Sequence, residues 1–204
     1  MRFIYSILIF LFLLSVQAQK TTITELEVDK LINPLGLDSK NPDFSWIIKS
    51  EDYNLNQTHY QVFVATDRTF SNKSLLWDSG KVNSSESVYV KYQGKSLEYA
   101  TKYYWTVKVW TNQSKRPKQS KISSWTTGLM NEKQWNSDWI GVNNDDKKDP
   151  KSPYFTNDFV VRNQIISANL FITSRGIYEA HINGKRVGKS YLTPGWTSYN
   201  NRIQ

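Results

Sequence analysis

The sequence contains no cysteine, so the protein can form no disulfide bonds and has no thiolate ligands for a metal. Its two histidines, His59 and His181, lie far apart and outside any carboxylate cluster, which does not fit a zinc site. Gly-x-Ser-x-Gly and the glycine-rich phosphate-binding or dinucleotide-binding motifs are also absent. We therefore predict no metal site, no cofactor and no machinery for nucleophilic catalysis.

Carboxylates suited to glycoside hydrolysis are scarce as well. That chemistry needs two of them about 5–10 Å apart on a rigid frame. The available residues lie in a mixed-charge loop or on polar faces, where solvation opposes a raised pKa. They are Asp145, Asp146, Asp149, Asp158 and Glu179. We expect none of them to be catalytic.

One apolar run is long enough to suggest targeting. Phe3–Leu14 follows the charged Arg2 and precedes Val16-Gln17-Ala18, a small-residue cleavage signature. The alternative, a membrane anchor, needs about 20 apolar residues. The pattern predicts a signal peptide over residues 1–18 and a secreted or periplasmic protein that does not stay in the membrane. Because no cysteine follows, we expect no lipid anchor.

The chain from residue 22 to 128 predicts an all-β fold. Tyr103–Trp110 is the clearest strand, with Tyr103, Trp105, Val107 and Val109 on one face. Tyr60–Ala65 is apolar on both faces, so we expect it to be central. Phe44 and Trp46 alternate onto one face of a further strand. About seven short strands separated by turns are typical of an immunoglobulin-like or fibronectin type III sandwich.

The formal net charge is +8, and removal of Arg2 with the signal peptide lowers it to +7. Lys115, Arg116, Lys118 and Lys121 form one local cluster within 112–121, which we interpret as a solvated basic loop. Export and the scatter of the other basic residues argue against a nucleic-acid partner.

Residues 129–152 read as a linker, and 153–204 as the start of a second β-domain. Asn183-Gly184 predicts a type I′ hairpin, because both residues accept positive φ. The alternation in Ala168–Ile172 predicts another strand. Since these strands cannot bury a core alone, we expect unpaired edges and a tendency to aggregate over 165–204.

Several separated segments resemble the N-terminal region of bacterial α-L-rhamnosidases of glycoside hydrolase family 78. They are NPLGLD and PDFSW near the start, WNSDWIG at the junction, and YEAHINGKRVG followed by YLTPGWTSYNNRIQ at the end. The resemblance implies a fibronectin-III-like domain followed by a truncated jelly-roll-like β-sandwich. It also implies a parent enzyme that hydrolyses terminal α-L-rhamnose with inversion, its catalytic (α/α)6 barrel lying beyond Gln204. The chain is then expected to be a non-catalytic accessory fragment whose partner, through the parent, is a rhamnose-containing poly- or oligosaccharide.

Sugar binding is the function left to the fragment itself. Trp196 and Tyr199 offer aromatic rings, and Asn183 and Arg202 offer hydrogen bonds. The alternative is that the two aromatic residues pack in a core or between domains. Some family members have a calcium-dependent rhamnose-binding module in this region. The resemblance therefore allows calcium in the parent, but we can assign its ligands to no residues of this chain, and some of them would lie beyond Gln204. Two other hypotheses stay open: a free-standing carbohydrate-binding or adhesion module, and a small complete enzyme, which requires a carboxylate pair in a cleft.

Overall fold

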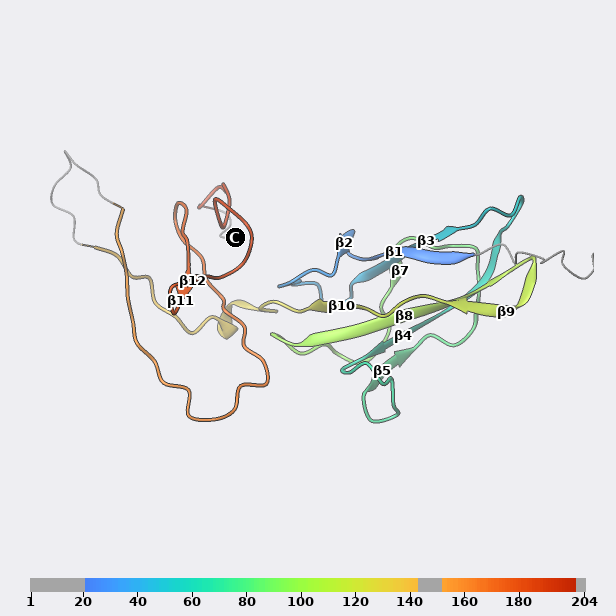
Figure 1. Cartoon of the computed structure of the whole chain (residues 1–204), viewed down its shortest axis with the longest axis horizontal. Coiled ribbons are helices and arrows are strands. Elements are labelled where there is room, and N and C mark those ends of the chain that lie inside the picture. The colour runs from blue at the N-terminus through green and yellow to red at the C-terminus, as the bar shows by residue number, and fades with distance from the viewer. Residues whose placement is uncertain (1–20, 143–151, 201–204) are drawn as a thin grey trace, which may run out of the picture. The chain divides into compact units, whose positions relative to one another are not determined.

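The computed structural model describes residues 21–142 and 152–200 (Figure 1). Over these ranges the regular structure is β-strand, apart from one 3-10 turn, η1 (Glu132–Gln134). The predicted all-β class is confirmed. No helix in the described part of the chain is long and apolar enough to cross a membrane. The chain divides into a first unit that ends at Trp139 and a second that begins at Ile140.

The first unit is a sandwich of two antiparallel sheets, which Figure 1 shows as two layers. The first sheet has the order β2-β1-β3-β7. Its strands are β1 (Thr22–Val28), β2 (Leu31–Ile32), β3 (Asp43–Lys49) and β7 (Val90–Lys91). A bulge between Thr24 and Glu27 interrupts the β1–β3 register.

The second sheet has the order β10-β8-β4-β5, and two further strands, β6 and β9, pair with β4 and β8. Its strands are β4 (Gln57–Ala65), β5 (Leu75–Asp78), β6 (Val82–Asn83), β8 (Lys102–Thr111), β9 (Ser114–Gln119) and β10 (Ser123–Thr126). The predicted central strand is confirmed, because β4 lies between β8 and β5.

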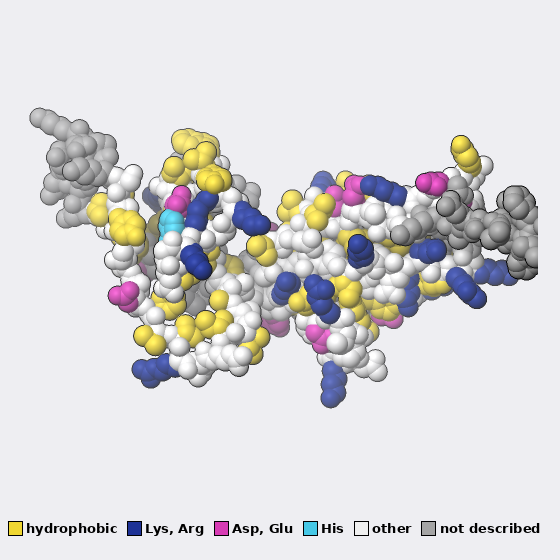
Figure 2. All heavy atoms as spheres, in the orientation of Figure 1, with side chains coloured by type: hydrophobic (Ala, Val, Ile, Leu, Met, Phe, Trp, Pro, Cys, Tyr) yellow, Lys and Arg dark blue, Asp and Glu magenta, His cyan; other side chains and the backbone are white. Residues whose placement is uncertain are grey.

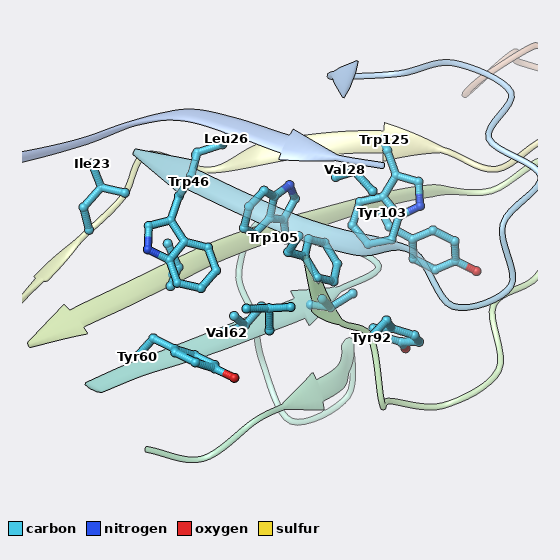
Figure 3. Packing of buried hydrophobic residues seen from close by; sticks show 14 of the residues in the cluster. Ile23, Leu26, Val28, Trp46, Tyr60, Val62, Tyr92, Tyr103, Trp105 and Trp125 are labelled. Atoms are coloured by element: carbon cyan, nitrogen blue, oxygen red, sulfur yellow. The ribbon is translucent and has the colours of Figure 1, made fainter. Parts of the chain in front are cut away.

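Aromatic side chains fill the space between the sheets (Figure 3). Trp105 of β8 is fully buried, and its ring centre lies 4.6 Å from that of Phe44 in β3. Trp46 meets Tyr60 at 5.4 Å, edge to face. Such pairs add to the stabilisation that burial of their large apolar area provides. The apolar faces predicted for β3 and β8 therefore lie against the core as expected, together with one of the two apolar faces of β4.

Hydrogen bonds join residues 33–37, near the start of this sandwich, to residues 124–128 at its end; we call this contact the clasp, and two glycines make it possible. Leu37 forms a parallel bridge with Thr127, and the Gly128 amide donates to the Leu37 carbonyl at 2.7 Å. Gly36 has φ +75°, and a Cβ on Gly128 would lie 2.6 Å from the Gly36 oxygen. Asn33 adds to the clasp, because its Oδ1 accepts from the Ser124 amide at 3.1 Å. Residues 33–38, the NPLGLD segment, therefore stabilise the fold of the first unit by these contacts.

Buried polar groups connect the loops to this core. The Tyr103 hydroxyl near the start of β8 accepts a hydrogen bond from the Glu98 amide at 2.7 Å, as in the tyrosine corner of immunoglobulin-like domains. Gln57 accepts from the Trp46 indole at 3.0 Å and donates to the carbonyls of Ser84 and Glu86. These bonds satisfy groups whose burial would otherwise be costly.

The predicted basic loop over 112–121 is wrong in its middle. Residues 114–119 form β9, which pairs with β8 from Thr111–Ser114 to Lys108–Gln119. The strand was not predicted because its sequence is polar throughout. It is an edge strand, and its exposed lysines and Pro117 discourage pairing with a further strand. Within residues 87–92, only Val90–Lys91 forms a strand, β7, which pairs with β3.

Among the described residues of the second unit, the regular structure is one two-stranded hairpin, formed by β11 (His181–Ile182) and β12 (Lys185–Arg186). The strand predicted at Ala168–Ile172 is not formed, because no described segment pairs with it. Many large apolar side chains of this unit are exposed; Ile166, for example, is 97% exposed. Figure 2 shows hydrophobic side chains on the surface of this part of the chain.

Candidate carbohydrate-binding surface

The hairpin is built around the predicted turn. Asn183 and Gly184 have φ angles of 50° and 75°, the left-handed pair that a type I′ turn requires. His181 then pairs with Arg186, and Ile182 with Lys185. The Val187 amide donates to the Ala180 carbonyl at 2.8 Å, which extends the hairpin by one further bond.

The chain after the hairpin is fastened back onto its base. The Tyr178 amide donates to the Thr193 carbonyl at 2.8 Å, and the Thr193 hydroxyl donates to the Tyr178 carbonyl at 3.0 Å. The Gly176 amide donates to the Tyr199 hydroxyl at 2.7 Å. These contacts organise residues 176–199 as one local surface, although the unit has little regular structure.

Trp196 and Tyr199 lie together on this surface. Their ring centres are 6.5 Å apart and the rings are tilted by 56°. Trp196 is 92% exposed, so its ring is free to stack on a sugar. Tyr199 is half-buried and its hydroxyl is held by Gly176.

The other two predicted ligands are not brought to this pair. Asn183 lies exposed at the hairpin tip, where its backbone conformation makes the turn. Arg202 lies outside the described residues. Of the four predicted residues, the structure therefore joins Trp196 and Tyr199.

A polar cluster on the hairpin was not predicted from the sequence. The Glu179 carboxylate lies 3.1 Å from His181 Nε2 and 3.8 Å from Arg186 Nε. The Arg186 guanidinium stands 3.9 Å from the centre of the Tyr191 ring and donates to the Ser190 carbonyl. The alternation of Glu179 with His181, and the hairpin register, could have indicated the first contacts. No sequence signal indicates that Tyr191 folds back onto Arg186.

This arrangement suits binding better than catalysis. Glu179 is shared between His181 and Arg186, and Asp158 is exposed. Asp145, Asp146 and Asp149 lie outside the described residues. Within the described ranges no group of three or more His, Cys, Asp or Glu side chains could hold a metal ion.

A groove of about 640 Å³ lies in the first unit, along β1 and the junction of β9 with β10. Its lining includes Thr24, Glu25, Lys118 and Lys121. Thr24 Oγ1 is buried there with no hydrogen-bond partner. The groove contains none of the residues predicted to bind sugar.

Comparison with known families agrees with the architecture of the first unit. Residues 23–131 match the family described as Rha78A-like, N-terminal immunoglobulin domain. The chain belongs to this family. Residues 163–204 match a second family, the α-L-rhamnosidase N-terminal domain. The resemblance inferred from the motifs is therefore confirmed, and the two matches follow one another along the chain in the expected order.

The relatives are α-L-rhamnosidases. One from Formosa agariphila is 31% identical over 95% of this chain, and one from an Alteromonas species is 30% identical over 89%. The alignments cover 23% and 21% of those proteins, so the chain spans about a fifth of the length of these curated relatives.

Solved structures show the same fold. The crystal structure of Streptomyces avermitilis α-L-rhamnosidase complexed with L-rhamnose is 38% identical, with a TM-score of 0.56 over 60% of this chain and 12% of that one. The Aspergillus terreus enzyme has a TM-score of 0.63 over 90% of this chain and 21% of its own. At 20% identity, the latter likeness concerns the fold alone.

Proposed function

We propose that this chain is the N-terminal accessory region of an exported α-L-rhamnosidase that releases terminal α-L-rhamnose with inversion, and that it has no hydrolase activity of its own. The observation that supports this most is the succession of two N-terminal rhamnosidase domains, at 23–131 and 163–204, in one chain. The chemistry agrees, because Asp158 and Glu179, the two candidate carboxylates within the described residues, are exposed, and Glu179 contacts His181 and Arg186 instead of a second carboxylate.

The test compares two proteins. One is the chain as given, and the other extends it with the reading frame downstream of codon 204. Both are assayed with 4-nitrophenyl α-L-rhamnopyranoside. We expect no release of nitrophenol by the chain itself and steady release by the extended protein, with the β-anomer of rhamnose as the first product. Activity of the short chain alone, or a frame that ends directly after codon 204, contradicts the proposal.

Export belongs to the same proposal and rests on residues 1–18 of the sequence. Expression with and without these residues, followed by N-terminal sequencing of the exported fraction, tests it. The mature protein is expected to begin at Gln19. Retention of the full-length chain in the cytoplasm would contradict export.

A second candidate function is sugar binding by the surface around Trp196. The high exposure of this ring favours it, since an exposed indole beside a second aromatic ring is a usual platform for sugars. The partner would be a rhamnose-containing oligosaccharide, and the same activity fits a free-standing carbohydrate-binding or adhesion module. Titration with such oligosaccharides should show binding that Trp196→Ala abolishes. Trp139→Ala, which removes another exposed indole, is the control.

A further inference from the structure

The outer face of the second sheet in the first unit carries a regular pattern of cationic and aromatic side chains. Tyr103 and Trp105 of β8 are buried in the core, so the alternate residues of this strand point away from it. Those residues are Lys102, Tyr104, Thr106, Lys108 and Trp110. Phe63 of β4 lies on the same face, directly opposite Thr106.

Each aromatic ring on this face has at least one cation over it. Lys108 Nζ is 4.9 Å from the centre of the Phe63 ring, Lys81 Nζ is 4.8 Å from Trp110, and Arg68 Cζ and Lys102 Nζ are 5.3 and 5.6 Å from Tyr104. These distances lie within the range of cation–π attraction, about 6 Å. The rings themselves are half-buried, so they hold the cations in place at the surface.

Among the described residues, no carboxylate forms an ion pair with any of these four cations. The ion pairs between described residues involve Lys49, Lys91, His181 and Arg186, and none of the four cations of this face. Asp78 faces the same way as Phe63 and adds one negative charge to this face; its Oδ1 accepts a hydrogen bond from the neutral Gln61 side chain at 2.7 Å.

The carboxylate next to Arg68, that of Asp67, adds a second negative charge. Asp67 accepts hydrogen bonds from the side chain and the amide of Thr69, at 2.6 and 2.7 Å, and these bonds hold its pKa below the ordinary value. Four cations against the two carboxylates of Asp67 and Asp78 leave this face with an excess of two positive charges, in a chain whose formal net charge is +8.

We propose that this cationic face, defined by Arg68, Lys81, Lys102 and Lys108 over Phe63, Tyr104 and Trp110, binds an acidic polysaccharide through its carboxylate or sulfate groups. The Cα atoms of Lys102 and Lys108 are separated by six residues of one strand, or about 20 Å at the usual rise, so the face can contact several consecutive sugars. Because the rings already restrict the cations, less side-chain entropy is lost on binding.

A polysaccharide fits this face better than a nucleic acid does. Single-stranded nucleic acids bind by stacking bases on exposed aromatic faces. Here the rings are half-buried and cations stand over them, which leaves charge rather than stacking as the available interaction. The preference for a glycan rests on the proposed function, whereas the cationic character of the face does not.

Binding of the full chain to immobilised dextran sulfate and polygalacturonate tests the proposal, with neutral dextran and poly(dT) as comparisons. The test variant is Arg68→Gln/Lys81→Gln/Lys102→Gln/Lys108→Gln. The matched control, Lys30→Gln/Lys40→Gln/Lys49→Gln/Lys91→Gln, removes the same charge from residues outside this face, two of them in β3 and β7. A third variant, Lys81→Arg/Lys102→Arg/Lys108→Arg, keeps the charge and shows whether changes at these positions disturb the fold.

We expect the wild type, the control variant and the arginine variant to bind at least one acidic polysaccharide, and neutral dextran not at all. The test variant should bind at least about tenfold more weakly, because four cations that face the anionic chain are lost together. Equal losses in the test and control variants, no binding by the wild type, or tighter binding of poly(dT) would overturn the proposal. None of these outcomes depends on rhamnosidase activity of the extended protein, so the two proposals fail separately.

Discussion

The two units of this chain have similar alternating apolar sequences and opposite degrees of burial. In the first unit, Trp46, Trp105 and Trp125 are at most 1% exposed, because two sheets enclose them. In the second, Ile166 and Trp196 are 97% and 92% exposed. The comparison shows that an apolar alternation becomes a buried strand only where a second sheet covers it.

The largest expected effect concerns tryptophans in the two units. Trp125→Ala should lower the free energy of unfolding by about 3–5 kcal/mol, because it leaves a large cavity in the core. Trp196→Ala should change it by less than about 0.5 kcal/mol, as for other exposed positions. Urea denaturation followed by far-UV circular dichroism measures both. Equal effects of the two substitutions would show that Trp196 is buried in solution.

A smaller effect is expected at glycines. Gly128→Ala places a methyl group where a Cβ would lie 2.6 Å from the Gly36 oxygen, so the clasp must shift, at a cost of about 1–3 kcal/mol. Gly141→Ala is the matched control, since no atom lies within 4 Å of its Cβ position. The same denaturation experiment compares them. A neutral Gly128→Ala would mean that the Leu37–Thr127 bridge adjusts freely.

Stability at alkaline pH should depend on two buried tyrosines of the core, Tyr92 and Tyr103. Burial raises the pKa of Tyr92 to about 12, and burial also raises that of Tyr103. A raised pKa in the folded state favours the neutral phenol, so this contribution to stability is complete below about pH 10 and is lost as the pH rises toward 12. Unfolding midpoints in urea between pH 8 and pH 12 should show the decline, and Tyr92→Phe should make it shallower. An identical pH dependence in Tyr92→Phe would assign the decline to other groups.

The smallest effect on stability is expected at Ile166. Ile166→Lys adds charge to a side chain that is 97% exposed, so it should change the free energy of unfolding by less than about 0.5 kcal/mol. It should still reduce self-association, because exposed large apolar side chains promote association between copies. Sedimentation velocity over a concentration series measures this. Unchanged association would mean that Ile166 lies outside the surface through which copies associate.

The core of the first unit could be predicted because its strands alternate clearly. Trp105 and Val107 lie on an apolar face of β8, and Lys108 on the opposite face. The strand β9 was missed for the opposite reason. An edge strand needs hydrogen bonds on one side alone, so its Lys-Arg-Pro-Lys sequence shows no apolar period.

The binding surface could be predicted only in part, because it depends on contacts between residues that are distant in the sequence. The Asn183-Gly184 turn was predictable because it depends on two neighbouring residues. The contacts of Tyr199 with Gly176, and of Arg186 with Tyr191, depend on how the following loop folds back. The same holds for the clasp, which joins Leu37 to Thr127 across most of the first unit.

The parallel direction of that clasp has a mechanical consequence. The clasp joins a segment that follows β2 to the segment that ends β10, and the two run in the same direction. The Leu37 amide donates to the Thr126 carbonyl, and the Gly128 amide donates to the Leu37 carbonyl. Tension applied through the chain at both ends would load these hydrogen bonds together in shear rather than one after another. The sandwich should therefore resist extension until the clasp fails as a whole. Single-molecule pulling would show this as one force peak, lowered in Gly128→Ala.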